Sequence, residues 1–294
     1  MSFSEYQRDK MGHASISPTG EFVAGAWQSF TLTYKAGYFG IDDTGSIKIV
    51  HRFASDMGRP QFDAPDKPNY VTCEASNGAV LHMEYDNKRN VRPWDKTLMI
   101  RIVRGFLREG DQIIVRFGDP RGGCPGMRLQ TFCEESFEFR VLVDAFATYH
   151  YTVLPQQPII KIIPGAPVLY KAIIPTHIQC NSNFRLALKG EDAWGNPSDQ
   201  CDGVLKISTN LPVTNLPNQI TLTPKKRTFL IPDLRCETAG DLVITLEDET
   251  GAQYYSNPMQ VDKKRELLGF WGDLHGQSEE TIGTNSARDF FTFA

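Results

Sequence analysis

Short runs in which apolar and polar residues alternate are the feature that most constrains how this chain can fold. A period of two occurs in residues 112–117, 137–144, 184–189 and 242–247. Because successive side chains of a strand point to opposite faces, each run predicts a strand with one apolar face. Gly- and Pro-rich turn signals separate the runs, and no helical pattern lies between them. We therefore expect a mainly β chain built from sandwiches rather than from βαβ units.

The length and the connectors predict the domain organisation. A chain of 294 residues has room for about two domains, and its 40% hydrophobic and 22% charged residues are typical of a globular protein. Residues 154–158, Leu-Pro-Gln-Gln-Pro, form an extended connector. We expect an N-terminal β-rich domain over 1–155, a β-sandwich of immunoglobulin-like size over 156–261, and a remainder over 262–294.

One turn supports the immunoglobulin-like assignment. Residues 191–197 read Glu-Asp-Ala-Trp-Gly-Asn-Pro, in which Gly195 and Asn196 can adopt positive φ and Pro197 ends the strand. The segment resembles the D-x-x-G-N-P turn of bacterial immunoglobulin-like modules. Residues 203–208 and 238–248 fit a middle and a late strand of such a module.

Charge and cysteine usage exclude several classes of protein. Lys and Arg number 31 against 35 Asp and Glu, a net charge of −4 that offers no field for nucleic acid or an anionic membrane. No run approaches the roughly 18 apolar residues of a membrane helix, and the first residues lack the apolar core of a secretory signal. The six cysteines form no C-x-x-C pair, which favours reduced, buried thiols. We expect a cytoplasmic protein that binds neither nucleic acid nor membranes.

Two polar loops leave alternatives open. Residues 87–93, Asn-Lys-Arg-Asn-Val-Arg-Pro, form a basic loop that is either a solvated hairpin tip or a contact for an anion or a partner. Residues 118–126 are rich in glycine, and their N–H groups could face an anion. That segment lacks the G-x-x-x-x-G-K-[ST] pattern of a phosphate-binding loop, so a rigid turn between strands is the alternative.

The chemically most pointed motif lies near the end of the chain. Residues 269–278 read Gly-Phe-Trp-Gly-Asp-Leu-His-Gly-Gln-Ser, after an apolar run over 267–271 that predicts a short buried strand. Asp273, His275 and Gln277 would then share one side of the chain. An imidazole and a carboxylate two residues apart can both reach one divalent cation. Polar residues at the end of a strand also suit a site in a β/α barrel.

Residues 270–278 resemble the first motif of the PHP (polymerase and histidinol phosphatase) superfamily, and more closely an uncharacterised bacterial family of PHP-like proteins. In that family β-rich regions precede a G-D-L-H opening. Residues 117–119, 128–132, 192–197 and 281–294 also look like it. The resemblance implies a metal-dependent hydrolase barrel that acts on a small-molecule ester or phosphoester.

The resemblance also implies a set of metal ligands. Family members usually open with H-x-H, whose first position matches His275 and whose second is Gln277. The implied ligands of a divalent Zn, Mn or Fe ion are thus His275, Asp273 and Gln277. A helix is predicted from Asn285 or Ser286 onward, but a barrel needs about 200 further residues. We expect an accessory region followed by the first strand and helix of an incomplete barrel, inactive by itself.

Two other hypotheses remain open at this stage. The chain could be a β-sandwich binding or interaction module without catalysis, which recognises a carbohydrate or a partner protein through its loops. It could instead be a pair of structural domains that covers a barrel edge or mediates oligomers. In that case the apolar residues 267–271 and 290–293 would promote self-association through an exposed C-terminal segment.

Overall fold

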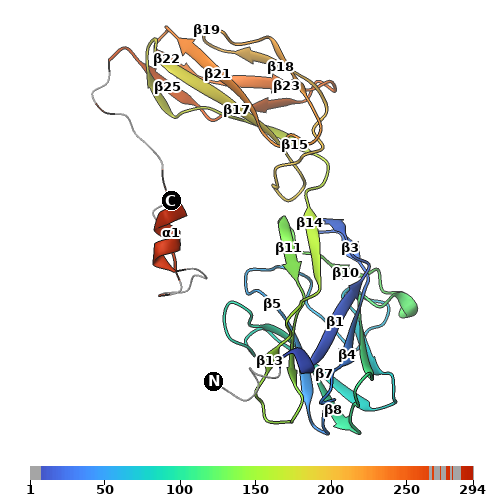
Figure 1. Cartoon of the computed structure of the whole chain (residues 1–294). Coiled ribbons are helices and arrows are strands. Elements are labelled where there is room, and N and C mark those ends of the chain that lie inside the picture. The colour runs from blue at the N-terminus through green and yellow to red at the C-terminus, as the bar shows by residue number, and fades with distance from the viewer. Residues whose placement is uncertain are drawn as a thin grey trace. The chain divides into compact units, whose positions relative to one another are not determined.

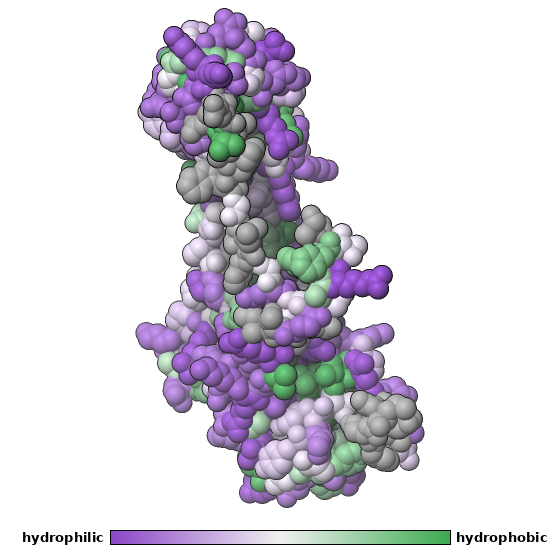
Figure 2. All heavy atoms as spheres, turned by 90° about the vertical axis from the view of Figure 1, so that its left-hand side faces the viewer, coloured by the Kyte–Doolittle hydropathy of each residue, from purple (hydrophilic) through white to green (hydrophobic). Residues whose placement is uncertain are grey.

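The protein divides into two compact units that are both built from β-strands (Figure 1). One unit comprises Met1–Ile163 with Gly276–Ala294, and the other comprises Pro164–His275. On the face shown in Figure 2, hydrophobic residues form small patches among hydrophilic ones, as expected when strands turn their apolar sides inward. The computed structural model describes residues 8–264, 267, 272, 276–278, 280 and 286–293.

Two large antiparallel sheets form the sandwich of the first unit. One has the strand order β1-β4-β9-β6 and the other the order β13-β12-β5-β8-β7. More and less buried side chains alternate along β1, β4 and β9, as expected, whereas every residue of β5 is buried. The strands are β1 (Gly12–Ser17), β4 (Phe30–Ala36), β5 (Ser46–His51), β6 (Val71–Ala75), β7 (Val80–Asp86), β8 (Lys96–Arg104), β9 (Gln112–Phe117), β12 (Arg140–Asp144) and β13 (Thr152–Val153).

Two smaller sheets complete this unit. The order β11-β14-β2 joins an antiparallel and a parallel pair, and β10 pairs with β3. The last strand of the unit therefore follows the connector at residues 154–158 and hydrogen bonds back to an early strand. The strands are β2 (Glu21–Val23), β3 (Trp27–Gln28), β10 (Met127–Arg128), β11 (Glu134–Glu138) and β14 (Ile159–Ile163).

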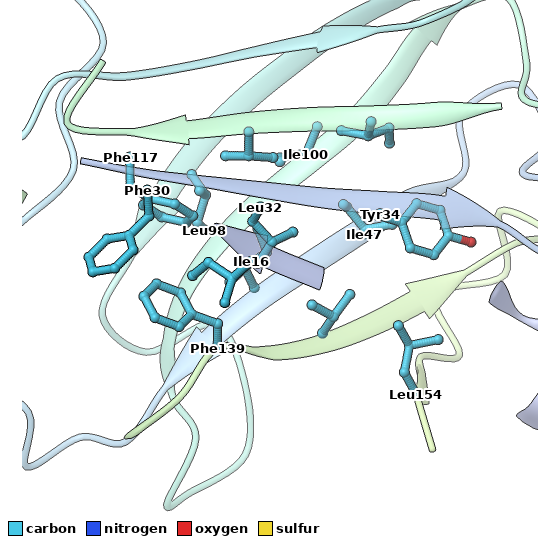
Figure 3. Close-up of a cluster of buried hydrophobic side chains, with 14 of the residues drawn as sticks. Ile16, Phe30, Leu32, Tyr34, Ile47, Leu98, Ile100, Phe117, Phe139 and Leu154 are labelled. Atoms are coloured by element: carbon cyan, nitrogen blue, oxygen red, sulfur yellow. The ribbon is translucent and has the colours of Figure 1, made fainter. Parts of the chain in front are cut away.

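The core of the first unit lies between its two large sheets (Figure 3). Leu32 and Tyr34 of β4 and Ile47 of β5 are fully buried there. The Tyr34 hydroxyl donates a hydrogen bond to the Met11 carbonyl oxygen at 2.6 Å, which satisfies the polar end of a buried ring. Burial of each such side chain stabilises the unit by about 2 kcal/mol.

The run predicted as one strand over residues 137–144 serves two sheets. Phe137, Phe139 and Val141 are all buried, so the alternation is confirmed. However, β11 ends at Glu138 and pairs with β14, whereas β12 begins at Arg140 and pairs with β5. The chain changes sheets at Phe139, a known way of making a corner in a sandwich.

The second unit is a sandwich of three sheets. Their strand orders are β15-β17-β21-β19, β16-β25-β22 and β20-β18-β23-β24. Its core is a separate cluster that includes Leu186, Leu234 and Leu246, all fully buried. The strands are β15 (Leu169–Ile173), β16 (His177–Gln179), β17 (Asn183–Glu191), β18 (Gly203–Thr209), β19 (Val213–Thr214), β20 (Gln219–Leu222), β21 (Phe229–Cys236), β22 (Gly240–Leu242), β23 (Ile244–Glu247), β24 (Gln253–Tyr255) and β25 (Met259–Asp262).

The mainly β, sandwich-based fold class is confirmed, but the expected start of a β/α barrel is not. The described residues contain one α-helix, α1 (Ala287–Phe293), and no β/α barrel. The helix begins where the sequence predicts it, because the Ser286 hydroxyl accepts a hydrogen bond from the Asp289 N–H at 3.1 Å. The strand predicted over 267–271 lies outside the described residues except for Leu267, which is exposed. No helix in the described part of the chain is long and apolar enough to cross a membrane.

Candidate ligand-binding cleft

The five-stranded sheet of the first unit carries a cleft on the face turned away from the core. Ile47 and Ile49 of β5 point into the core, so Lys48 between them points outward. The strand register places Lys48 between Leu142 of β12 and Met99 of β8. Lys48 and Leu142 form part of the floor of a cleft of about 610 Å³. The floor thus comes from interior strands, and two loops form its walls.

Lys48 is a buried ammonium group without a carboxylate partner. Its residue is only 9% exposed, and no described Asp or Glu lies within 4.0 Å of its Nζ atom. Nζ donates to the Arg89 carbonyl oxygen at 3.2 Å and lies 3.9 Å from the ring centroid of Tyr151. Burial, and then the charge of Arg89, lower the pKa of Lys48, while Asp144 acts in the opposite direction. The surroundings of Lys48 therefore disfavour the protonated, charged form of its side chain.

The basic loop between β7 and β8 forms one wall. The Asp86 carboxylate accepts a hydrogen bond from the Lys88 N–H at 2.7 Å, which shapes the start of the loop. The Asn90 side-chain amide donates to the Trp94 carbonyl oxygen at 2.9 Å, and the Trp94 N–H donates to the Val91 carbonyl oxygen at 2.9 Å. The loop is therefore ordered by its own hydrogen bonds, while most of its residues remain exposed, as in a solvated hairpin tip. Its role as a contact for an anion or a partner stays a prediction.

The connection between β12 and β13 forms the opposite wall. Asp144 is buried, and its carboxylate accepts hydrogen bonds from the N–H groups of Thr148 at 3.0 Å and Tyr149 at 2.7 Å. The Tyr151 hydroxyl shares a 2.7 Å hydrogen bond with the Ser46 hydroxyl on β5. These contacts hold Tyr149 at the rim of the cleft, where it is 75% exposed, and Tyr151 over Lys48.

Trp94 stands at one end of the cleft between two guanidinium groups. The Cζ atom of Arg140 lies 4.7 Å from its ring centroid and that of Arg52 lies 5.1 Å from it. Such cation–π contacts hold an aromatic ring and its neighbours in a defined orientation. Trp94 is half-buried, so part of its ring remains available to a ligand.

The charges of the cleft are of one sign. Its basic lining residues are Lys48, Lys88, Arg89, Arg92 and Arg140, and no described Asp, Glu, His or Cys lines it. Outside the lining, carboxylates contact three of these groups: Glu84 pairs with Arg89, Asp95 with Arg92 at 3.7 Å, and Glu138 with Arg140 at 3.9 Å. The two lysines have no such neighbour among the described residues. A chain with a net charge of −4 therefore concentrates positive charge at this place.

A second pocket of about 190 Å³ adjoins the cleft at Trp94. Its lining includes Gln130, Phe132, Glu134 and Glu138, and it is more apolar than the cleft. Burial raises the pKa of Glu138, against the opposing charges of Arg140 and Arg52. The pocket combines the carboxylates of Glu134 and Glu138 with the guanidinium of Arg52, whereas the described charged groups that line the cleft are all cations.

The glycine-rich loop is a rigid turn and does not form an anion site. Asp119 is buried and accepts hydrogen bonds from the Thr72 hydroxyl at 2.6 Å and from the Arg121 guanidinium at 2.6 Å. The Arg121 guanidinium holds the pKa of the Asp119 carboxyl far below its usual range. Gly118 has a φ of 63°, and a Cβ there would lie 2.3 Å from the Met127 N atom. The Asp119 carboxylate already accepts the hydrogen bonds of this loop that an anion would otherwise accept.

The metal ligands expected from the sequence are only partly placed. Asp273 and His275 lie outside the described residues, and Gln277 is exposed. Their role as ligands of Zn, Mn or Fe stays a prediction. In the described part of the chain, no three His, Cys, Asp or Glu side chains come together in a way that could hold a metal ion. Self-association through the C-terminal segment also stays a prediction.

Reasoning from the sequence found the basic loop but missed the floor and the aromatic residues of the cleft. Lys48 lies within Ser-Ile-Lys-Ile-Val, residues 46–50. A lysine inside a run that is otherwise buried on both faces was the available signal. Arg140, Tyr149 and Tyr151 gave no local signal, because their relevance depends on the pairing of β12 with β5.

Comparisons with known proteins show likeness at the level of architecture only. No family model and no curated protein matches the chain. Among solved structures it is similar to InvD of Yersinia pseudotuberculosis (10% identity, TM-score 0.33, covering 93% of this chain and 66% of that one). It is also similar to the adhesin InvE of the same organism (9%, TM-score 0.26, 86% and 59%) and to the BSP domain of a biofilm associated protein (9%, TM-score 0.21, 85% and 29%).

These findings correct three predictions. The resemblance to the PHP superfamily is wrong, because no family model matches the chain. The PHP-like hydrolase function, which was implied by that resemblance, is wrong on the same ground. The cytoplasmic location is also not retained, since no matching family or curated protein supports it.

Proposed function

We propose that the chain is a non-catalytic binding module whose first unit binds an anionic ligand in the basic cleft. Lys48 carries this proposal, as a buried ammonium group on the cleft floor that lacks a carboxylate partner. Burial of a charge without a counter-charge costs free energy, and a bound carboxylate, sulfate or phosphate would supply the missing partner. Hydrogen bonds between ionised groups are also among the strongest available in a protein.

The lining favours recognition over catalysis. Nucleophilic and acid–base catalysis most often use His, Cys, Asp or Glu, and none of the described residues that line the cleft is of these types. The cleft instead presents aromatic surface and positive charge. It lies on a sheet whose other face packs against the hydrophobic core. A rigid scaffold of this kind binds a ligand with little ordering cost.

The ligand needs few charges rather than many. Nucleic-acid affinity comes mainly from numerous phosphate contacts along an extended basic surface. Here the positive groups gather in one cleft of a chain that is acidic overall. That distribution suits a ligand that carries a few negative charges on a short part of its length.

Calorimetric titration of the full chain tests the proposal. The probes are hexagalacturonate and a hyaluronan hexasaccharide, titrated into wild type, K48M and K67M. Lys67 lies in the same unit, is 67% exposed and is not part of the cleft lining, so K67M is a control of equal charge change. We expect wild type and K67M to bind at least one probe equally, and K48M to bind it at least about tenfold more weakly. Absence of binding to both probes, or equal binding by K48M, would overturn the proposal.

A further inference from the structure

The pocket beside Trp94 contains a buried side chain with an unused hydrogen-bonding atom. Gln130 is fully buried, and its Nε2 atom donates to the Phe132 carbonyl oxygen at 3.0 Å and to Glu134 Oε2 at 2.9 Å. Its Oε1 atom has no hydrogen-bond partner among the described residues. A flipped amide would place an oxygen against these two acceptors, so the orientation is determined by its neighbours. A residue that lines the pocket therefore has a buried acceptor that lacks a donor, which costs free energy.

The pocket and the cleft have complementary chemistry and share one wall. Trp94 lines both, and Glu138 of the pocket contacts Arg140 of the cleft at 3.9 Å. In the cleft, on one side of Trp94, the described charged groups that a ligand meets are cations only. In the pocket it meets Gln130, two carboxylates and the guanidinium of Arg52, a mixed lining that suits an uncharged polar group. A molecule that fills both must therefore carry an anionic group and, next to it, an uncharged part with hydrogen-bond donors.

The uncharged part must also present apolar surface. Phe132 is 39% exposed and lines the pocket together with Phe137 and Trp94. A sugar ring meets both requirements, since its C–H face packs on aromatic rings while its hydroxyl groups donate hydrogen bonds. A peptide fits less well, because peptides that bind sheets add to a free edge strand. The cleft floor is instead formed by β5 and β12, which lie inside the sheet.

We infer that the cleft and the pocket together bind an acidic saccharide in which charged and uncharged sugars are neighbours. The carboxylate or sulfate of one sugar lies at Lys48 in the cleft. The adjacent uncharged sugar lies in the pocket and donates a hydroxyl or amide hydrogen to Gln130 Oε1. This inference rests on the proposed function, because it names the ligand of the same cleft.

Matched hexasaccharides test the inference on the full chain. Hyaluronan alternates a uronate with an uncharged amino sugar, hexagalacturonate carries a carboxylate on every sugar, and cellohexaose carries none. We expect hyaluronan to bind at least about tenfold more tightly than hexagalacturonate and cellohexaose. Equal affinity for hyaluronan and hexagalacturonate, or tighter binding of a hexathymidylate strand, would overturn the inference.

Substitutions in the pocket separate the two proposals. F132A and Q130M should weaken hyaluronan binding about five- to tenfold and change hexagalacturonate binding less than about twofold. F106A is the matched control, since Phe106 is 50% exposed in the same unit but lines neither cavity. F132A tests the pocket even if Q130M fails to fold. Unchanged hyaluronan binding in F132A, with binding still lost in K48M, would overturn this inference and leave the proposed function standing.

Discussion

Two buried charged groups, one in each sandwich, have opposite surroundings. In the second unit, Glu191 is 4% exposed and contacts Lys171 and Lys189, each at 2.8 Å. Burial alone would raise the pKa of Glu191, but these two ammonium groups together lower it. In the first unit, Lys48 is buried to a similar degree and has no carboxylate partner among the described residues. The carboxylate of Glu191 is thus neutralised by two cations, whereas the ammonium group of Lys48 has only uncharged hydrogen-bond acceptors and an aromatic ring beside it.

In the turn that follows β17 in the second unit, the buried carboxylate of Asp192 also has a full set of hydrogen-bond donors. Asp192 accepts hydrogen bonds from the N–H groups of Gly165, Trp194 and Asn196 at 2.9–3.0 Å, and from the Asn196 side chain at 2.9 Å. Every one of these contacts lies within the unit. We therefore interpret the second unit as a scaffold and the first as the binding unit.

The largest effect is expected from D192A, which tests the scaffold side of this comparison. Asp192 and Asn196 are buried, so removal of the carboxylate leaves the backbone and side-chain donors of Asn196 and two further N–H groups without this acceptor. We expect the second unit to lose about 3 to 5 kcal/mol of unfolding free energy, while the first unit keeps its own transition. Differential scanning calorimetry measures both transitions. D241A, at an exposed position of β22, is the control, and a loss below 1 kcal/mol in D192A would contradict the assignment.

Acid should weaken the first unit through His51. This side chain stacks on Phe137, and burial lowers its pKa to about 4, against about 6.5 in the unfolded chain. Between these values the unfolded chain binds more protons, so stability falls as the pH falls from 6.5 to 4, by about 3 kcal/mol in total. Urea unfolding at several pH values should show this loss in wild type. The loss should be absent in H51F, and equal acid sensitivity of both proteins would refute it.

K48M should separate binding from stability. The substitution replaces a buried ammonium group that has no carboxylate partner by an apolar side chain of similar length. It should leave the unfolding free energy unchanged or raise it by about 1 kcal/mol. The pKa of Lys48 is lowered in the folded state, so stability rises with pH until the unfolded group loses its proton. The advantage of K48M should therefore shrink at alkaline pH. Urea unfolding at neutral and alkaline pH measures this, and a clearly destabilised K48M would remove the contrast with Glu191.

The smallest effect is expected at the rim. Tyr149 is 75% exposed and lines the cleft, so Y149A should reduce affinity for the preferred hexasaccharide about threefold. Calorimetric titration detects this change. Y255A, at a 63% exposed tyrosine of the second unit, should bind like wild type. A larger effect in Y255A than in Y149A would reverse the roles of the two units.

Much of the fold could be predicted from the alternation of apolar residues. The strands β9 and β17 and the turn after Glu191 lie where the sequence predicts them. The change of sheets at Phe139 could not be predicted, and neither could the similar break at Val243 between β22 and β23. The pattern of one buried face continues through both breaks, and the hydrogen bonds that change partner leave no trace in it.

The candidate site was predictable only where chemistry is concentrated in one segment. The basic residues 87–93 are adjacent in sequence, so their charge was visible there. The metal motif at the C-terminal end was equally local, yet the family and the function assigned from it were wrong. A short motif shows which residue types are adjacent in sequence. Its function depends on residues from elsewhere in the chain that surround it in the folded protein.

The sequence by itself determined that this protein is mainly β, because the period of apolar residues dictates which side of each strand is buried. It also determined the basic loop and the tight turns, which depend on neighbouring residues. Only the tertiary structure decided that Lys48, Trp94, Arg140 and Tyr151 line one cleft. These residues lie far apart in the chain and come together through strand pairing, whose register is set by the packing of the whole sheet rather than by any one segment.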